Sequence, residues 1–212
     1  MVDFDREDFL INFTYNTNKI EGSRLRFEDV KNIIQNENYP ANATDEDIYE
    51  CVGLYSTMSG LVDNLGLKIT PRLITQIHYG IFSNSKSFAG RLRSKPNERV
   101  AIVDSSGDAV GITAPPEEVY ANIKDLCKTH SSKLNDVYEP FRFHIRFENI
   151  HPFLDGNGRV GRVLINYMLL QQNRSPIDIK YEDRFNYYKI FELDLKDGVE
   201  VFEDFYEKHY WR

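Results

Sequence analysis

The most specific pattern in this chain is HPFLDGNGRVGR, which occupies residues 151–162. Pro152 lacks a backbone N–H and restricts the residue before it, so it ends any helix that precedes it. Gly156 and Gly158 allow a tight turn and a close approach of a ligand to the backbone. Beyond the loop, apolar residues recur at spacings of three and four, which predicts a helix over residues 157–172. The pattern therefore predicts a glycine-rich loop that leads into the N-terminus of a helix.

The same segment gathers charged groups that suit a bound phosphate. The N-terminus of a helix carries unpaired N–H groups and a partial positive charge, which favour an anion. Arg159 and Arg162 add two cations on neighbouring helix positions. Asp155 supplies a carboxylate for a Mg²⁺ ion held between protein and phosphates. His151 stands just before the loop, and an imidazole with its ordinary pKa of about 6.5 accepts a proton at neutral pH.

Each of these features alone has an ordinary explanation, because glycine-rich loops are often only turns and a single histidine is more often structural than catalytic. Their combination is far more specific. It resembles the signature of Fic-domain proteins, His-Pro-Phe-x-Asp-Gly-Asn-Gly-Arg-x-x-Arg, which residues 151–162 match at every fixed position. The resemblance implies that the chain transfers AMP from ATP to a hydroxyl side chain of a protein. It also implies the fold of that family, a helical core with a β-hairpin flap beside the motif.

The resemblance assigns a role to each motif position. His151 is expected to be the general base for the target hydroxyl, and Asp155 to bind the Mg²⁺ that bridges phosphate oxygens. The residues expected to contact the phosphates are Gly156, Asn157, Gly158, Arg159 and Arg162. Tyr188 stands where relatives often place a tyrosine against the adenine. An asparagine that relatives carry seven residues later falls on Leu195 here, which leaves the base and ribose contacts open.

A second pattern ends the first predicted helix, at residues 17–22. Thr17 and Glu21 are four residues apart and share a helix face, and Gly22 follows as a stop signal. The ordinary explanation is a glycine-capped helix end, although a glutamate there is mildly unfavourable against the helix dipole. The segment resembles the self-inhibitory motif of Fic proteins, [Ser/Thr]-x-x-x-Glu-[Gly/Asn]. That resemblance implies that Glu21 pairs with Arg162, the arginine that otherwise holds the γ-phosphate, so that ATP binds with its α-phosphate turned from the line of attack.

Residues 99–113 predict a β-hairpin with its turn at residues 104–108. An isolated hairpin is marginal in water, so it is expected to lie on the helical body. The hairpin is either a packing element or an edge along which an extended target segment docks. In the second interpretation, Ile102 and Val103 are the candidate clamp residues.

The composition restricts the class of protein. The chain has 212 residues with 41% hydrophobic residues, a formal net charge of −7 and a pI near 5.3, which argues against a general nucleic-acid binder. Cys51 and Cys127 lack a CxxC pattern and are expected to be buried free thiols. The N-terminal segment does not resemble a signal peptide, and no apolar run approaches the roughly 20 residues of a membrane span. We therefore expect a cytoplasmic protein without nucleic-acid or membrane partners.

The periodicity predicts an all-α fold, a compact bundle of about eight helices with one hairpin. We expect one domain over residues 1–212, with residues 1–69 as a helical extension that holds the inhibitory helix and residues 70–212 as the catalytic core. The predicted helices cover about 5–21, 27–36, 44–65, 70–82, 115–130, 136–150, 157–172, 182–196 and 199–210, with Gly198 separating the last two.

The leading interpretation is a protein adenylyltransferase that depends on Mg²⁺ and ATP, is restrained by Glu21, and modifies a Tyr, Thr or Ser hydroxyl of a protein, including its own. The alternatives are a hydrolase that removes AMP with the help of Glu21, an enzyme with both activities, a transferase with another phosphate donor, and a non-catalytic nucleotide-binding regulatory module. A metal site formed by His144, His151 and Asp155 is a weaker alternative, because the usual HExxH spacing is absent. A homo-oligomer is compatible with the sequence.

Overall fold

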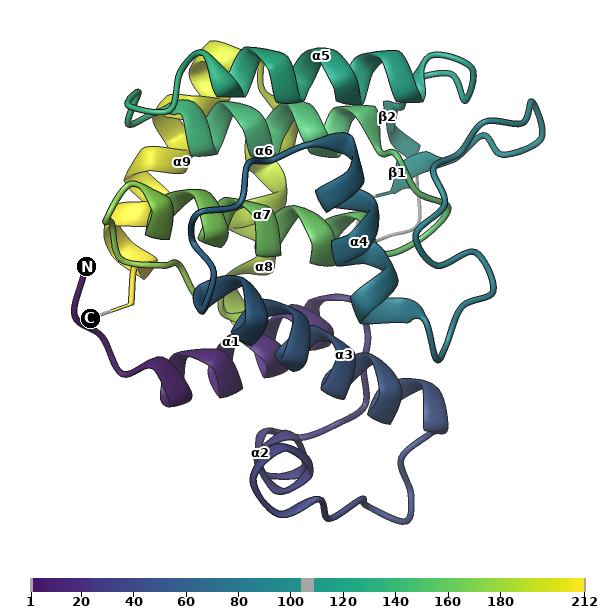
Figure 1. Ribbon diagram of the computed structural model, residues 1–212, viewed down its shortest axis with the longest axis vertical. Helices are drawn as coiled ribbons and strands as arrows, with labels where there is room; N and C mark the ends of the chain where they lie inside the picture. The colour runs from purple at the N-terminus through teal and green to yellow at the C-terminus, as the bar shows by residue number, and fades with distance from the viewer. Residues whose placement is uncertain (1, 104–108, 212) are drawn as a thin grey trace.

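The computed structural model describes residues 2–103 and 109–211, and the side chains of residues 102–112 are outside this description. Within these ranges the chain forms nine α-helices, two short 3₁₀ helices and one two-stranded sheet (Figure 1). The predicted all-α class with one hairpin is thereby confirmed. No helix in the described ranges has the length and apolar character needed to cross a membrane.

Local signals in the sequence explain the start of the N-terminal helices. Thr44 and Thr70 accept hydrogen bonds from the backbone N–H groups of Asp47 and Leu73, and Pro71 occupies the first turn of its helix. These caps confirm the predicted entries. The helix bounds are α1 Arg6–Ile20, α2 Phe27–Asn36, α3 Asp45–Val62, α4 Pro71–Phe82, α5 Val119–Ser131, α6 Glu139–Ile150, α7 Asn157–Gln171, α8 Arg184–Lys189 and α9 Leu195–His209.

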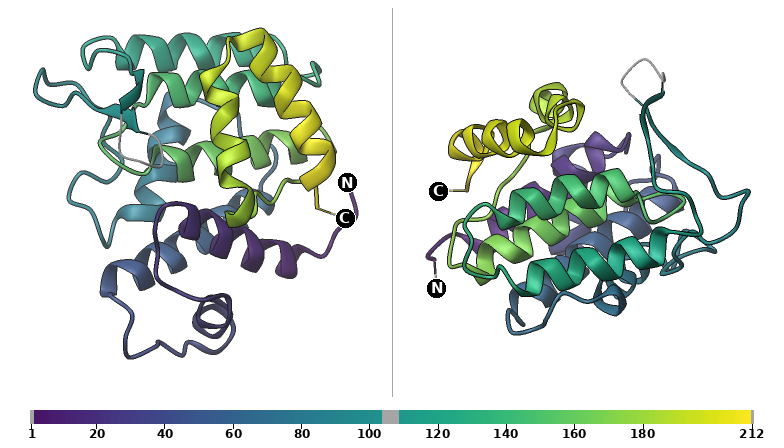
Figure 2. Two further views of the ribbon diagram at one scale, coloured as in Figure 1. Left: turned by 180° about the vertical axis from the view of Figure 1, so that it is seen from behind. Right: turned by 90° about the horizontal axis from the view of Figure 1, so that it is seen from above.

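The motif helix α7 is the centre of the fold. Every side chain from Arg159 to Leu170 is buried, as expected of a helix that is covered on all sides. Helix α6 lies along one side of α7 with α5 beyond it, while α1, α3 and α4 contact α7 from other directions (Figures 1 and 2). The N-terminal end of α7 therefore meets segments from both halves of the chain. Cys51 and Cys127 are buried free thiols, as predicted.

The C-terminal third differs from the prediction. The expected helix over residues 182–196 is broken into the 3₁₀ turn η1 (Tyr181–Asp183), α8 and a second 3₁₀ turn, η2 (Ile190–Glu192). The predicted separator Gly198 instead lies inside α9, and a Cβ there would come within 3.0 Å of the Ile190 carbonyl oxygen. The glycine thus permits close packing against η2. Helix α9 is capped by Asp194, whose side chain accepts hydrogen bonds from the backbone N–H groups of Lys196 and Asp197. Helices α5 and α6 also begin a few residues later than expected, because turns precede them.

The predicted hairpin consists of β1 (Ala101–Val103) and β2 (Ala109–Ile112), which pair antiparallel. Its expected turn at residues 104–108 is outside the described residues. Arg93, only 1% exposed, donates hydrogen bonds to the carbonyl oxygens of Ala114, Ile150 and His151. One buried guanidinium therefore joins the base of the hairpin to the end of α6.

Asn166 joins α7 to the segment that follows it. This side chain is 1% exposed, donates to the carbonyl oxygens of Arg162 and Ile177, and accepts from the N–H of Ile177 at 2.7 Å.

Asn166→Ala would leave buried backbone groups unpaired, so we predict a loss of about 3 kcal/mol in the free energy of unfolding. Urea denaturation measures this loss. Asn36→Ala, which removes an exposed amide, is the control, and equal stability of the two variants would contradict the prediction.

Candidate active site

The motif loop is shaped by two residues with left-handed backbone conformations. Helix α6 ends at Ile150, His151 has φ 52°, and Pro152 follows, so the predicted helix stop is confirmed. Gly156 has φ 79°, and a Cβ there would overlap the ring of Phe82. The loop thus requires a glycine at the position just before α7.

Two side chains hold this loop in place. The Asn157 amide accepts from the N–H of Phe153 at 2.8 Å and donates to its carbonyl oxygen at 3.0 Å, so this side chain fixes the loop while its backbone N–H belongs to the first turn of α7. His78 stacks on Phe153 at 3.9 Å between ring centroids and accepts from the N–H of Gly90 at Nδ1. Its Nε2 therefore carries the proton and donates to the carbonyl oxygen of Asp155 at 3.1 Å. The His78 ring thus supports the loop at Phe153 and at the Asp155 carbonyl oxygen.

His151 is arranged as a proton acceptor. Its Nδ1 lies 3.2 Å from the carbonyl oxygen of Glu148, which can only accept, so Nδ1 carries the proton and Nε2 keeps its lone pair. Burial lowers the pKa of His151, although the hydrogen bond to Glu148 opposes this shift. The ring is therefore neutral at neutral pH, and its side chain remains 20% exposed. Both properties suit a general base.

Glu21 and Arg162 form the expected ion pair. Arg162 Nη2 donates to Glu21 Oε1 at 2.5 Å and to the carbonyl oxygen of Thr17 at 3.2 Å. Burial opposes ionisation of Glu21, but the charges of Arg162 and Arg159 and the hydrogen bond from Arg162 leave the pKa of this carboxyl below its ordinary value. A Cβ at Gly158 would lie 2.5 Å from Glu21 Oε1. The absence of a side chain at this position therefore lets Glu21, at the end of α1, approach the N-terminus of α7.

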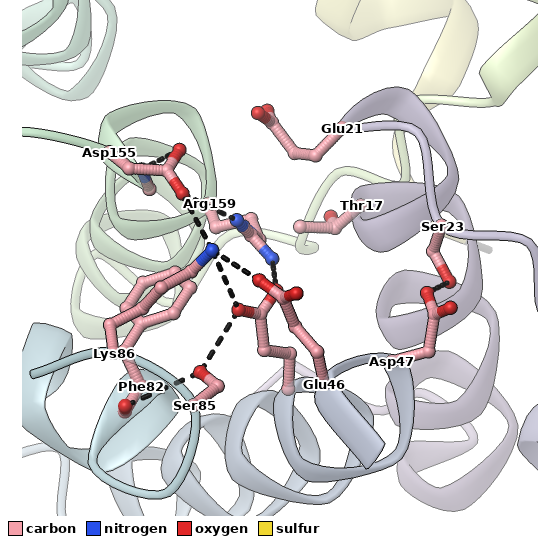
Figure 3. A network of polar contacts seen from close by, with 12 residues as sticks. Thr17, Glu21, Ser23, Glu46, Asp47, Phe82, Ser85, Lys86, Asp155 and Arg159 are labelled. Atoms are coloured by element: carbon pink, nitrogen blue, oxygen red, sulfur yellow. Dashed lines mark hydrogen bonds and ion pairs between the residues drawn. The ribbon is translucent and has the colours of Figure 1, made fainter. Parts of the chain in front are cut away.

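A second charged cluster surrounds Arg159 and Asp155 (Figure 3). Arg159 donates from Nη1 to Glu50, its guanidinium lies 4.5 Å above the ring of Phe82, and its Nη2 is 3.9 Å from Asp155 Oδ2. Lys86 reaches the same Asp155 oxygen at 3.2 Å and also contacts Glu50 at 3.6 Å. Neither Lys86 nor Glu50 belongs to a sequence motif, and the sequence analysis missed both.

The donor set fits a phosphate ligand with a magnesium ion. The buried Nε atoms of Arg159 and Arg162 have no hydrogen-bond partner among the residues that the structure describes, and an incoming anion could accept from them. The side chain of Asp155 is 45% exposed, and Mg²⁺ commonly takes one or two protein carboxylates together with substrate phosphates. In the described part of the chain, no group of three His, Cys, Asp or Glu residues could hold a metal by itself, so the alternative site with His144 finds no support.

The sequence analysis also named residues for contacts with the adenine, the ribose and the target protein. Tyr188 is half-buried, with its ring 5.8 Å from that of the buried Tyr187, and burial raises its pKa. Leu195 begins α9 and is exposed. Ile102 and Val103 lie on β1, but their side chains are outside the described residues, so the docking role stays a prediction.

Glu148 is a further buried group, to which the sequence analysis assigned no functional role. Its Oε2 lies 3.9 Å from His151 Nδ1. Its Oε1 faces Gly161 and has no hydrogen-bond partner in the described ranges. Burial raises the pKa of Glu148 to about 8, although the charge of Arg162 opposes the shift. Its position in the apolar pattern of α6, four residues after His144, is the signal that could have revealed it.

Comparison with known proteins gives one consistent result. Residues 68–169 match the model of the Fic/DOC family. The protein adenylyltransferase Fic of Nematostella vectensis is 27% identical over 183 residues, which cover 82% of this chain and 41% of that protein. The protein of the same name from Drosophila sechellia is 36% identical over 87 residues, which cover 39% of this chain and 18% of that protein. The chain thus spans about two fifths of the length of the first of these relatives.

Solved structures agree with this result. A Fic-domain-containing signalling protein from Bacteroides thetaiotaomicron superposes with a TM-score of 0.79 at 25% identity, covering 91% of this chain and 76% of that one. Fic-1 from C. elegans superposes with a TM-score of 0.77 at 23% identity, covering 97% of this chain and 61% of that one. At 23% identity, the similarity to Fic-1 shows a common fold only.

The raised pKa of Glu148 leads to a prediction about stability. Between pH 6.5 and 8, folded Glu148 keeps a proton that the unfolded chain has released, so raising the pH favours unfolding. The lowered pKa values of His78, His144 and His151 act in the opposite direction, because their imidazoles still bind some protons near pH 6.5 in the unfolded chain but not in the folded protein. We predict that Glu148 by itself lowers the free energy of unfolding by about 1.5 kcal/mol across this window, measured as the difference in pH dependence between the wild type and a variant that cannot titrate at this position. Denaturant titrations at several pH values should show this difference.

Glu148→Gln should remove this contribution, because the amide does not titrate, so its stability should fall less, or rise, as the pH increases. Glu200→Gln, a substitution of an exposed glutamate on α9, is the matched control and should keep it. An unchanged pH dependence in Glu148→Gln would contradict the assignment.

Proposed function

Since this chain is a Fic-domain protein, we propose that it is a protein adenylyltransferase that moves AMP from ATP to a Tyr, Thr or Ser hydroxyl of a protein. The observation that carries the proposal is the convergence of a neutral His151 with a glycine loop at the N-terminus of α7 and two buried arginines with unpaired donors. These groups supply a base and a phosphate site, and the relatives named above are adenylyltransferases.

In the proposed reaction the acceptor hydroxyl oxygen attacks the α-phosphorus of ATP. A bond from that oxygen to phosphorus forms, the bond from phosphorus to the oxygen that bridges to the β-phosphate breaks, and pyrophosphate leaves. His151 Nε2 takes the hydroxyl proton. Arg159 and Arg162 hold the β- and γ-phosphates, and the backbone amides of Asn157 and Gly158 hold phosphate oxygens, whereas the N–H of Gly156 donates to Asp155 Oδ1 at 2.7 Å. A Mg²⁺ ion bound at Asp155 would offset negative charge on the leaving group.

The ion pair of Glu21 supports a restraint on this reaction. The Glu21 carboxylate takes the Nη2 donor of Arg162 that a γ-phosphate would need. Its negative charge would also repel the terminal phosphate. In this proposal ATP reaches its productive position only when Glu21 leaves Arg162, and residues 1–69 act as an extension that carries this inhibitory helix onto a core of residues 70–212.

The direct test is incubation of the protein with Mg²⁺ and ATP labelled in its α-phosphate. We predict strong self-labelling of Glu21→Gly and weak labelling of the wild type, because the substitution frees Arg162. Adding His151→Ala should reduce the labelling roughly a hundredfold or more, because the base is lost while the phosphate site is kept. Gel analysis and mass spectrometry measure the transferred AMP.

Other outcomes would identify other functions. Labelling that survives His151→Ala would remove His151 from its role as base. Release of AMP from a pre-modified protein, with no labelling by either form, would favour the hydrolase alternative. Nucleotide binding in both forms without transfer or release would favour a regulatory binding module.

A further inference from the structure

Glu50 lies outside the segment that matches the family model, yet its carboxylate reaches the motif helix. It is 7% exposed on α3, and each of its oxygens has a partner. Oε2 accepts from Arg159 Nη1, and Oε1 accepts from the hydroxyl of Ser85 at 3.0 Å and lies 3.6 Å from Lys86 Nζ. A buried carboxylate with this many partners is held in one orientation.

The contact with Glu50 fixes the orientation of Arg159. A free arginine side chain samples many rotamers, and holding it in one of them costs entropy. Here the ring of Phe82 supports one face of the guanidinium and Glu50 holds its Nη1. Within the described part of the chain the buried Nε has no hydrogen-bond partner. Nη2 points toward Asp155 (Figure 3), and the distance from Nη2 to Asp155 Oδ2 is 3.9 Å. Nε and Nη2 of an oriented guanidinium thus remain to donate to a ligand, with Nη2 on the side of Asp155.

We infer that Glu50 is a positioning residue of the nucleotide site, which holds the Arg159 guanidinium so that Nε and Nη2 meet a nucleotide phosphate. The inference rests on the proposed function for the identity of the ligand, but it does not require AMP transfer. It also gives α3 a part in the site itself, so that the N-terminal helices contribute to phosphate binding as well as to its restraint.

The surroundings of Glu50 indicate that it is not a second inhibitory residue like Glu21. Glu21 is at a helix end, its side chain is 26% exposed, and Gly22 with φ 93° follows it, so a small change at this end withdraws the carboxylate. Glu50 lies within the first two turns of α3 and accepts hydrogen bonds from Ser85 and from the buried Arg159. It could leave only if both hydrogen bonds broke. Moreover, it occupies one nitrogen of Arg159 and leaves the others to a ligand.

The test measures ATP affinity by calorimetry without Mg²⁺ in the Glu21→Gly background, where the restraint is absent. Glu50→Gln keeps the shape but loses the charge that holds Arg159. We predict about tenfold weaker ATP binding and an equal rise in KM for ATP, with kcat changed by less than about twofold. Glu46→Gln is the matched control, because Glu46 lies one turn earlier on α3 and contacts Lys86 but not Arg159. It should change the affinity by less than about twofold.

A double substitution separates positioning from general stability. When Arg159 is already replaced by alanine, Glu50→Gln should cause no further loss of affinity. If Glu50→Gln fails to fold, Glu50→Asp takes its place, with a smaller loss expected because the shorter carboxylate still carries the charge. Tighter ATP binding in the Glu50 variant would overturn the inference, because it would mean that Glu50, like Glu21, inhibits ATP binding. A lowered melting temperature with unchanged Kd and KM would overturn it in favour of a purely structural role.

The same titrations separate this inference from the proposed function. ATP binding with the predicted loss, in a protein that transfers no AMP, would support the role of Glu50 and overturn the adenylyltransferase proposal. If no variant bound ATP, both would be overturned.

Discussion

The ion pair between Glu21 and Arg162 is the interaction on which the rest of the site depends. Arg162 is 2% exposed, and a buried guanidinium without a partner would cost on the order of several kcal/mol. The fold therefore needs an anion at this point, whether from the protein or from a ligand. Because α1 supplies it at 2.5 Å, the phosphate site is neutralised from within the chain. A triphosphate and the Glu21 carboxylate then compete for the same donor.

The same balance of charges extends over all the groups around the N-terminus of α7. Arg159, Arg162 and Lys86 face the carboxylates of Glu21, Glu50 and Asp155. A nucleotide adds negative charge, so one of these carboxylates must give way or a cation must accompany the ligand. Glu21 is the carboxylate at a helix end, and Asp155 is the one open to solvent and to a metal. Glu50 is enclosed by its partners, which suits a residue that stays in place when a nucleotide binds or leaves.

Much of this arrangement follows from local signals. The stop at Pro152, the glycine before α7 and the caps at Thr44 and Thr70 act within a few residues, so the sequence pattern indicates them directly. The motif positions and the Glu21 pairing came from a resemblance to a family, and the ion pair agrees with it. By contrast, Glu50 and Arg159 are 109 residues apart, and no local pattern predicts their contact. The available signal was a glutamate in line with the buried Leu54 and Met58 on one face of α3. Gly198 misled the prediction because close packing, rather than a helix end, requires it.

The central claim is that Glu21 holds the arginine that a terminal phosphate needs. The most direct measurement is calorimetric titration of AMP, ADP and ATP into the wild type, Glu21→Gly and Glu21→Gly combined with Arg162→Ala, all without Mg²⁺. The account predicts that Glu21→Gly tightens ATP binding by about tenfold or more, changes AMP binding by less than about twofold, and loses its advantage when Arg162 is also replaced. An equal gain for AMP and ATP, or a gain that persists without Arg162, would contradict it.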